Sequence, residues 1–307
     1  MAAPRPPVDV VVPFHGTDAA LDSLLARLER LSRRDGDAVT VVDNRRTAGG
    51  PWQRGGIRVL PAPREQSSYH ARNVGAHAGG NPWLLFIDAD VEPPPSLADD
   101  YFAQPPGERA GVVAGAIEDA PATLADGVAA RYAYLEQTLA HENVLDGDHA
   151  FAQTANALVR REALEAVGGF TEGIRSGGDA DLCFRIVAAG WELERRPATV
   201  GHLGRASVRR LLRQYARYGA GAAWLDERYP GFLEVRPWGH LAGTVVRGGV
   251  RGAQLWLRGD RDGAIVTTLR PLTRACFRAG SLLPNAAAGP AELLGGALAR
   301  VRARRRS

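Results

Sequence analysis

Two aspartates, Asp88 and Asp90, directly follow the apolar run WLLFI at residues 83–87. If this run is a buried strand, the spacing of two residues directs both carboxylates to one face of the chain. Two neighbouring carboxylates repel each other unless a cation lies between them. Mg²⁺ and Mn²⁺ favour such oxygen ligands and are commonly completed by phosphate. The alternative interpretation is a solvated turn, because Asp-x-Asp is a very common tripeptide.

The front of the chain predicts an α/β fold that would position these carboxylates. Short β-branched runs indicate strands, and apolar residues at helical spacing indicate helices. Strands are expected at residues 8–13, 38–42, 57–60 and 83–87, and helices at residues 18–34 and 68–79. This order is typical of an open, mostly parallel sheet, in which ligands bind beyond the carboxyl ends of the strands. Those ends carry Pro13-Phe14-His15, Asp43-Asn44 and Asp88-Ala89-Asp90.

The composition excludes several kinds of chemistry. Every basic side chain apart from histidine is an arginine, so no lysine can act as a nucleophile or form a Schiff base. Two cysteines, Cys183 and Cys276, are too few for a cysteine metal cluster, and a disulfide framework is not expected. The first seven residues contain no apolar signal segment, and no uncharged apolar run reaches 18 residues. These features make the cytoplasm the expected location.

The charge of the chain divides it into two regions. The net charge of +4 combines a value of −9 for residues 1–204 with a value of +13 for residues 205–307. We therefore expect a catalytic domain at residues 1–204 and a basic, mainly helical region at residues 205–307. A basic region favours an anionic partner such as a phospholipid surface. No recognised nucleic-acid fold signature favours nucleic acid instead.

Seven short motifs follow one another in a fixed order along the front region. They are VVVPF (10–14), VVDN (41–44), ARNVG (71–75), FIDAD (86–90), ALVRR (157–161), VGGF (167–170) and GDADLCFR (178–185). Each motif is weak alone, but over residues 8–205 the ordered set resembles the family 2 glycosyltransferases. The resemblance implies a GT-A type fold, a nucleotide-diphosphate sugar donor, a divalent metal, and inversion at the anomeric carbon in a single displacement.

The resemblance also implies which residues bind the donor. Pro13 and Phe14 would form a wall beside the nucleobase, and Asp43 would meet the base or the ribose. Arg72 would face the base and the diphosphate, where a planar guanidinium suits phosphate oxygens. Asp88 would approach the ribose and the metal.

Two residues are expected to bind the metal, Mg²⁺ or Mn²⁺. The resemblance assigns direct coordination to Asp90. His202 stands where many relatives have a metal-binding histidine, and imidazole can complete a site made with a carboxylate and phosphate oxygens. The alternative for His202 is a packed or surface residue, which is the commoner role of a lone histidine.

Asp179 matches the catalytic base of the family. Inverting transfer needs one carboxylate to take the proton of the acceptor hydroxyl, while the metal stabilises the leaving diphosphate. The alternative role of Asp179 is structural, because an aspartate near a helix N-terminus can cap the helix. We assign that structural role to Asp181. The chain departs from the family at Gly178, where relatives usually have a glutamate implicated in positioning the acceptor.

Residues 207–224 predict a basic amphipathic helix with two possible roles. It could lie on a membrane surface, or it could pack on the rest of the protein with its arginines in water. Arginines at positions 300, 302, 304, 305 and 306 form a basic tail. Peripheral attachment to the inner face of the membrane, near a lipid-linked acceptor, is the hypothesis that these features favour.

The sequence leaves the substrates and two alternative functions open. UDP is the default donor nucleotide because it is the commonest in the family, and the acceptor is unknown, either lipid-linked or a small molecule. A catalytically silent sugar-nucleotide-binding or membrane-recruited scaffold is the first alternative, and Gly178 supports it. A sugar nucleotidyltransferase is the second, although Pro13-Phe14-His15-Gly16-Thr17 is a poor glycine-rich phosphate loop.

Overall fold

The computed structural model describes residues 5–137, 147, 149–204, 207–233 and 237–287. The chain divides into two compact units. Unit 1 is formed by Met1–Glu118, Leu139–Ile174 and Gly178–His202, and unit 2 by Asp119–Thr138, Arg175–Gly177 and Leu203–Ser307. The last segment of unit 1 ends close to the expected boundary at residue 204. Unit 2 also takes two short segments from the front of the chain.

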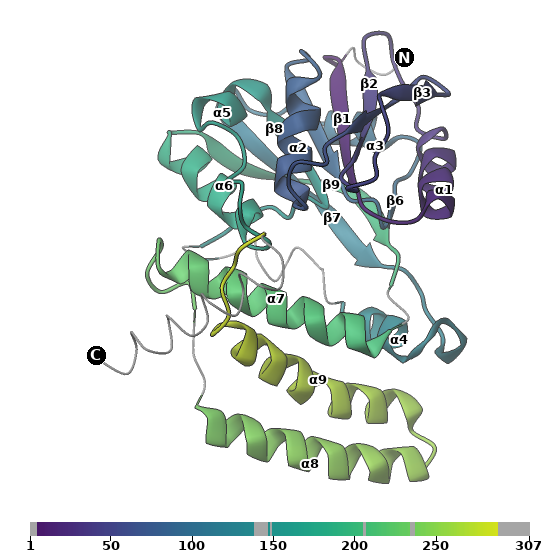
Figure 1. The fold of residues 1–307 in the computed structure, drawn as a ribbon, viewed down its shortest axis with the longest axis vertical. Helices are drawn as coiled ribbons and strands as arrows, with labels where there is room; N and C mark the ends of the chain where they lie inside the picture. Colours follow the sequence, from purple (N-terminus) through teal and green to yellow (C-terminus); the bar gives the residue numbers. More distant parts are fainter. Residues whose placement is uncertain (1–4, 138–146, 148, 205–206, 234–236, 288–307) are drawn as a thin grey trace. The chain divides into compact units, whose positions relative to one another are not determined.

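Unit 1 is built on one mixed sheet of nine strands (Figure 1). Their order across the sheet is β3 (Trp52–Arg54), β4 (Ile57–Pro61), β2 (Ala38–Asp43), β1 (Val8–Phe14), β5 (Trp83–Ile87), β8 (Asn156–Arg160), β7 (Ala110–Asp119), β9 (Glu192–His202) and β6 (Val91–Glu92). Strands β4, β2, β1 and β5 run parallel. Strand β8 is antiparallel to β5 and β7, and β6 is antiparallel to β9. The α/β fold class is confirmed, with parallel pairing concentrated in the front half of the sheet.

The parallel strands bury both faces, which explains their continuous apolar sequences. Every residue of β1 and β5 is buried, as expected for strands covered by helices on both sides. The helices of this unit are α1 (Asp18–Leu28), α2 (Ser68–His77), α3 (Leu97–Tyr101), α5 (Arg161–Ala166) and α6 (Gly178–Ala188). Helix α1 ends six residues before the predicted limit, because the chain turns there and the Ser32 amide donates to the Pro95 carbonyl.

Unit 2 consists mainly of helices that pack very closely. They are the short helix η1 (Leu124–Asp126), α4 (Val128–Glu136), α7 (Val208–Asp226), α8 (Trp238–Leu257) and α9 (Arg261–Gly280). Helices α7 and α8 both pack on α9. A Cβ added at Gly219 of α7 would collide with the Phe277 carbonyl, and one at Gly280 of α9 would collide with the Ala216 carbonyl. Glycines therefore allow the α7 and α9 backbones to touch.

Of the two roles considered for the helix at residues 207–224, packing is observed. Leu211 on the apolar side of α7 is buried with Ile265 and Leu269 of α9, and Tyr215 packs against the same cluster. The apolar side of α7 is therefore covered within its own unit. No helix among the described residues is long and apolar enough to cross a bilayer. The predicted basic tail at residues 300–306 lies outside the described residues.

Candidate active site

Arg72 is the buried centre of a group of charged side chains in unit 1. It lies in α2, and its side chain is only 4% exposed. Its guanidinium carbon is 5.6 Å from the ring centre of Tyr69 and 5.7 Å from that of Phe170. Two aromatic rings at this distance orient a cation and attract it through their quadrupoles. Arg72 Nε is buried without a hydrogen-bond partner among the described residues, so only the tip of the guanidinium is engaged.

The tip of Arg72 lies between two of the predicted site carboxylates. Its Nη2 donates to Asp88 Oδ1 at 2.5 Å, and its Nη1 lies 4.0 Å from Asp179 Oδ1. Asp88 directly follows β5, and Asp179 is the second residue of α6. The fold thus brings together three residues, Arg72, Asp88 and Asp179, that are separated by up to 107 positions in the chain.

The electrostatics of this group show an excess of negative charge. Burial alone would lower the pKa of Arg72, but the charges of Asp88 and Asp179 outweigh burial and raise that pKa above its ordinary value. Burial raises the pKa of Asp88; Arg72 acts to lower it, and the nearby charges of Asp90 and Asp179 raise it further. One guanidinium therefore faces two carboxylates, and Asp90 adds a third negative charge near Asp88, an arrangement that favours an additional cation.

Thr154 holds the carboxylate of Asp179 in place. The Thr154 hydroxyl donates to Asp179 Oδ1 at 2.9 Å, and the Thr154 amide donates to Oδ2 at 3.2 Å. Thr154 is almost completely buried, which fixes the direction of both donors. Asp179 is thus oriented by a neighbour outside its own helix. Asp181, the residue predicted to have a structural role, lies in the first turn of α6, where it accepts from the Thr171 hydroxyl and pairs with Arg185.

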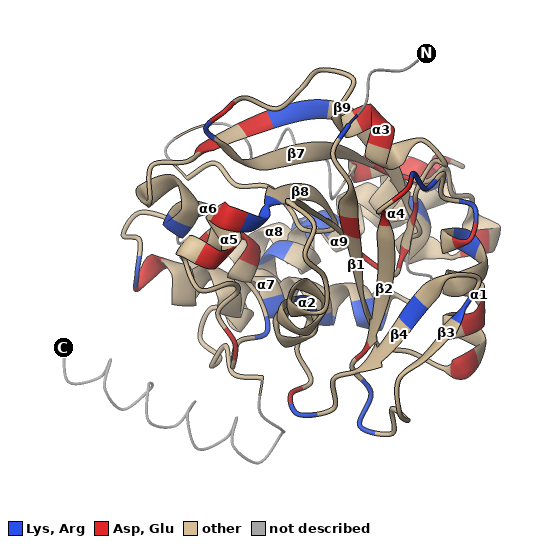
Figure 2. Ribbon diagram, turned by 90° about the horizontal axis from the view of Figure 1, so that it is seen from above, with Lys and Arg blue, Asp and Glu red and all other residues tan. Residues whose placement is uncertain are grey.

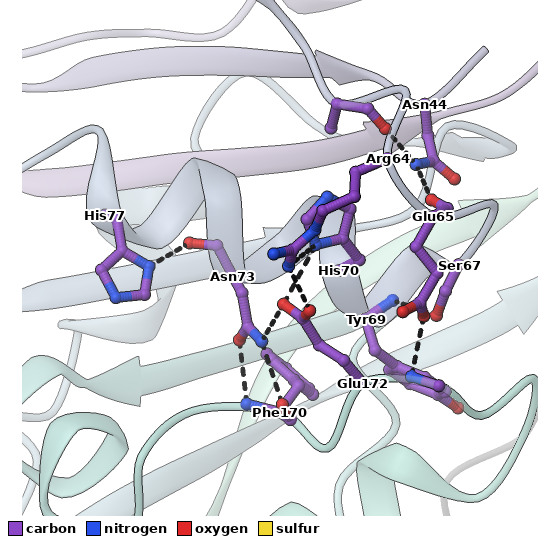
Figure 3. A network of polar contacts seen from close by, with 12 residues as sticks. Asn44, Arg64, Glu65, Ser67, Tyr69, His70, Asn73, His77, Phe170 and Glu172 are labelled. Carbon is purple, nitrogen blue, oxygen red and sulfur yellow. Dashed lines mark hydrogen bonds and ion pairs between the residues drawn. The ribbon is translucent and has the colours of Figure 1, made fainter. Parts of the chain in front are cut away.

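A buried polar network anchors α2 to the loop that leads toward α6 (Figure 3). Asn73 Nδ2 donates to the Phe170 carbonyl at 2.9 Å, and the Phe170 amide donates back to Asn73 Oδ1 at 2.9 Å. Glu172 accepts from Asn73 at 3.0 Å and from Arg64 at 2.6 Å, and lies 3.0 Å from His70 Nδ1. Burial opposes ionisation of Glu172, but these partners outweigh it and lower the pKa of Glu172. The network fixes the Phe170 ring beside Arg72.

Asp90 and His202 lie next to each other at one edge of the sheet. Val91 of β6 pairs with His202 of β9, and Asp90 Oδ2 is 3.7 Å from His202 Nε2. His202 is buried, whereas Asp90 is partly exposed. Within the described residues there is no cluster of three or more His, Cys, Asp or Glu side chains that could hold a metal. A metal here would need further ligands from a bound molecule, as a diphosphate provides.

At the other predicted strand ends, Asp43 is already engaged by a residue that sequence reasoning missed. Arg45 donates to both carboxylate oxygens of Asp43, with its Nη2 at 2.7 Å and its Nε at 2.9 and 3.1 Å. The Arg45 guanidinium also lies 5.5 Å from the ring centre of Phe14. Phe14 and Asp43 are paired across β1 and β2, and Pro13 is the preceding residue. Arg45 therefore lies over the Phe14 ring and against the Asp43 carboxylate, beside the residues predicted to form the nucleobase wall.

Tyr69 lies against Gly178, the position at which the chain departs from the expected family pattern. A Cβ added at Gly178 would lie 2.7 Å from two atoms of the Tyr69 ring and 2.9 Å from a third. That distance is well inside the 3.5–4.0 Å separation at which carbon atoms attract. The side chain of Tyr69 thus fills the space that any larger residue at position 178 would need.

The fold and the ordered motifs define the class of protein. Residues 9–168 match the model of the family described as "Glycosyl transferase family 2", and the chain belongs to this family. A mannosyltransferase from Pyrobaculum calidifontis, solved in complex with GDP-Man and Mn²⁺, has the same fold: the TM-score is 0.58 at 15% identity, covering 92% of this chain and 88% of that one. The predicted GT-A fold is confirmed.

The chain is also similar in sequence to two individual glycosyltransferases. The chain is 29% identical over 252 residues to a pre-mycofactocin glycosyltransferase of Mycobacterium tuberculosis, covering 75% of this chain and 51% of the relative. It is 26% identical over 181 residues to the glycosyltransferase AglE of Haloferax volcanii, covering 56% of each. The chain thus spans about half the length of the curated relatives it matches.

Proposed function

We propose that this protein transfers a sugar from a nucleotide-diphosphate donor to an acceptor hydroxyl, with inversion at the anomeric carbon. The observation that carries the proposal is the convergence of Arg72, Asp88 and Asp179 at the end of β5 and the start of α6. Membership of the glycosyl transferase family 2 supports it. The curated relatives are longer than the matched part, so their full activities are not assigned to this chain.

In the proposed reaction Asp179 acts as the base. The acceptor oxygen attacks the anomeric carbon and passes its proton to an Asp179 oxygen. A carbon–oxygen bond to the acceptor forms as the bond from the sugar to the diphosphate breaks, and the nucleoside diphosphate leaves with both bonding electrons. Thr154 keeps the Asp179 carboxylate directed. The Arg72 guanidinium, held between the Tyr69 and Phe170 rings, donates hydrogen bonds to the oxygens of the leaving phosphate.

Asp90 and His202 fit a divalent metal that also binds phosphate. A carboxylate and an imidazole within 3.7 Å of each other supply two ligands, and Asp88 adds negative charge beside them. These residues would hold Mg²⁺ or Mn²⁺, which would supply positive charge to the leaving diphosphate. We propose Asp90 as the direct ligand and His202 as the second.

The donor binds, in this proposal, across the carboxyl ends of β1, β2 and β5. Phe14 and Asp43 meet the nucleoside, with Arg45 as an additional contact, and Pro13 shapes the wall beside the base. UDP is the default nucleotide, and a GDP-sugar is tested beside it because the solved structure with this fold holds GDP-Man. The acceptor class that we propose is a lipid-linked or small-molecule hydroxyl, reached from the cytoplasmic face of a membrane.

The test compares donor binding with donor turnover. A panel of UDP- and GDP-sugars is titrated with Mn²⁺ or Mg²⁺, and slow release of the nucleoside diphosphate is followed, for the unchanged protein, Asp90→Asn and Asp179→Asn. Asp22→Asn is the matched control, because Asp22 is an exposed aspartate that forms an ion pair with the exposed side chain of Arg54.

We expect Asp90→Asn to lose metal-dependent donor binding, and Asp179→Asn to bind donor normally but release product at least ~100-fold more slowly, the usual range for loss of a general base. Asp22→Asn should match the unchanged protein. Undiminished turnover by Asp179→Asn would refute the assignment of the base. Donor binding without turnover in the unchanged protein, with any metal and acceptor tried, would favour the scaffold.

A further inference from the structure

Helix α8 presents a band of large apolar side chains to solvent. Val246 is 67% exposed, Val250 58% and Leu257 86%. At 3.6 residues per turn these three side chains point within about 40° of one another. Such a band on a helix is unusual because burial of apolar surface normally drives helices together. The exposed side of α8 therefore needs a partner.

The opposite side of α8 is already used for packing within unit 2. Gly248 and Gly252 are buried, and a Cβ added at Gly248 would lie 2.7 Å from both the Thr267 carbonyl and a Pro271 ring carbon of α9. Gly252 faces α9 in the same way, one turn further on. The α9 contact thus accounts for the glycines but not for the exposed valines and leucine.

Arginines and tryptophans flank the exposed apolar band on different sides. Arg247, Arg251 and Arg258 are all exposed and lie about 100–140° around the helix from Val246. Trp238 and Trp256 are exposed and lie about 80° from Val246 in the other direction. Tryptophan and arginine both favour the boundary between lipid headgroups and acyl chains.

The charged side chains of α8 are arginines (Figure 2). The helix contains no Asp or Glu. Asp260 follows it, but its side chain accepts from the Gly263 amide and caps α9. Asp262 forms an ion pair with Arg131. The two acidic side chains that follow α8 are thus engaged, and the charged side chains on α8 itself are arginines.

We propose that the exposed face of α8 docks on an anionic phospholipid membrane, with Val246, Val250 and Leu257 inserted at the level of the headgroups. An amphipathic helix of this kind lies in the plane of the interface and does not cross the bilayer. Arginines alone would also suit nucleic acid, but the apolar band would then stay in water. A second copy of this chain would bring two rows of arginines together, which like-charge repulsion opposes.

Helix α8 takes the membrane-docking role first considered for another helix. Helix α7 was the sequence-based candidate, and its apolar side is covered by α9. Membrane docking through α8 is independent of sugar transfer and can be measured without donor or metal.

The test measures binding of the full chain to sonicated vesicles by co-sedimentation. Vesicles of phosphatidylcholine alone are compared, at low and near-physiological salt, with vesicles in which about 30% of the lipid is anionic phosphatidylglycerol. One variant combines Val250→Asp with Leu257→Asp, and a second combines Arg247→Gln, Arg251→Gln and Arg258→Gln. The matched control combines Arg209→Gln, Arg210→Gln and Arg213→Gln, because these exposed α7 arginines change the net charge by the same amount.

We expect binding only to the anionic vesicles. Each arginine near an anionic surface contributes about 1 kcal/mol, so loss of the three α8 arginines should weaken binding roughly 100-fold, since 1.4 kcal/mol is a factor of ten. The α7 control should weaken it less than tenfold. The aspartate pair should abolish binding at near-physiological salt while the protein keeps its circular dichroism.

Several outcomes would overturn the proposal. Equal loss in the α7 and α8 arginine variants would mean that binding follows total charge and has no defined docking face. Binding that survives the aspartate pair would exclude insertion of the apolar band. A dimer in size-exclusion chromatography that the aspartate pair converts to a monomer, together with no vesicle binding, would assign the face to a second copy.

Discussion

Replacing Gly178 by alanine tests whether Tyr69 determines what this position can hold. The added Cβ would lie 2.7 Å from two Tyr69 ring atoms. Carbon atoms attract at 3.5–4.0 Å, so the ring or the start of α6 must retreat by roughly 1 Å. Tyr69 is buried and stacks on Phe170 with ring centres 5.9 Å apart. It therefore has little room to move without disturbing the rings that hold Arg72.

The expected magnitude follows from two opposing terms. Forcing an extra carbon into a packed site usually costs about 1–3 kcal/mol. Alanine in place of glycine gains up to about 1 kcal/mol in a helix, and less at the first residue of one. Gly178→Ala should therefore destabilise the protein by about 1–2 kcal/mol. Gly178→Glu, which restores the residue usual in the family, should destabilise it more.

A double-mutant cycle isolates the clash. Unfolding in urea is measured for Gly178→Ala, Tyr69→Ala and the double variant, with donor turnover as a second readout. In the Tyr69→Ala background, Gly178→Ala should become neutral or slightly stabilising, a coupling of about 1–3 kcal/mol. Gly249→Ala is the matched control, because a Cβ there meets nothing within 4 Å, and it should stabilise α8. Additive effects of the two substitutions at the site would refute the steric explanation.

Three further predictions concern other contacts. Thr154→Val removes the hydroxyl donor to Asp179. It should lower kcat about tenfold through loss of one hydrogen bond, while the donor KM stays unchanged. Thr154→Ser should restore kcat, and an equal loss with Ser would contradict the positioning role. Burial opposes ionisation of Asp37, but Arg5 and two backbone amides outweigh it and lower its pKa below 3.8, so its stabilisation is present near neutral pH and lost as the pH falls. Asp37→Asn should therefore cost about 1–3 kcal/mol at pH 7 in urea titrations, with a difference from the unchanged protein that disappears in acid; a constant difference would exclude this charge effect. Gly219→Ala, which collides with the Phe277 carbonyl, should cost at least about 1–3 kcal/mol in thermal unfolding, and an unchanged melting temperature would contradict the close α7–α9 contact.

The front half of the sheet could be predicted from the sequence because its signals are local. Continuous β-branched and aromatic runs predicted β1, β2, β4 and β5 almost to their limits, since strands buried on both faces carry little polar sequence. Strand β9 was missed because its sequence, ELERRPATVGH, mixes charged and apolar residues without a clear period, and only three of its eleven residues are buried. Its pairing with β6 depends on residues about 110 positions apart, which no local pattern reports.

In the candidate site too, residues within short motifs could be predicted, whereas residues brought close by the fold could not. The spacing of Asp88 and Asp90 after a strand singled them out only together with the ordered motifs around them, and the structure places Asp88 against Arg72. Thr154 and Tyr69 carry no motif of their own, so no local signal could have identified them. Arg45 could have been found, because an arginine two residues after Asp43 is within reach of its carboxylate.

The short strand β6 links the proposed metal pair to the stability of the sheet edge. β6 is two residues long and pairs only through Val91 and Glu92, so local opening of this edge breaks few hydrogen bonds. A ligand that bridges Asp90 and His202 would hold β6 against β9, because the two residues lie on either side of this pairing. At a ligand concentration 100-fold above its dissociation constant, linkage would favour the closed edge by about 2.7 kcal/mol. Occupancy of the site would then appear as slower amide hydrogen exchange along this edge, even without any sugar being transferred.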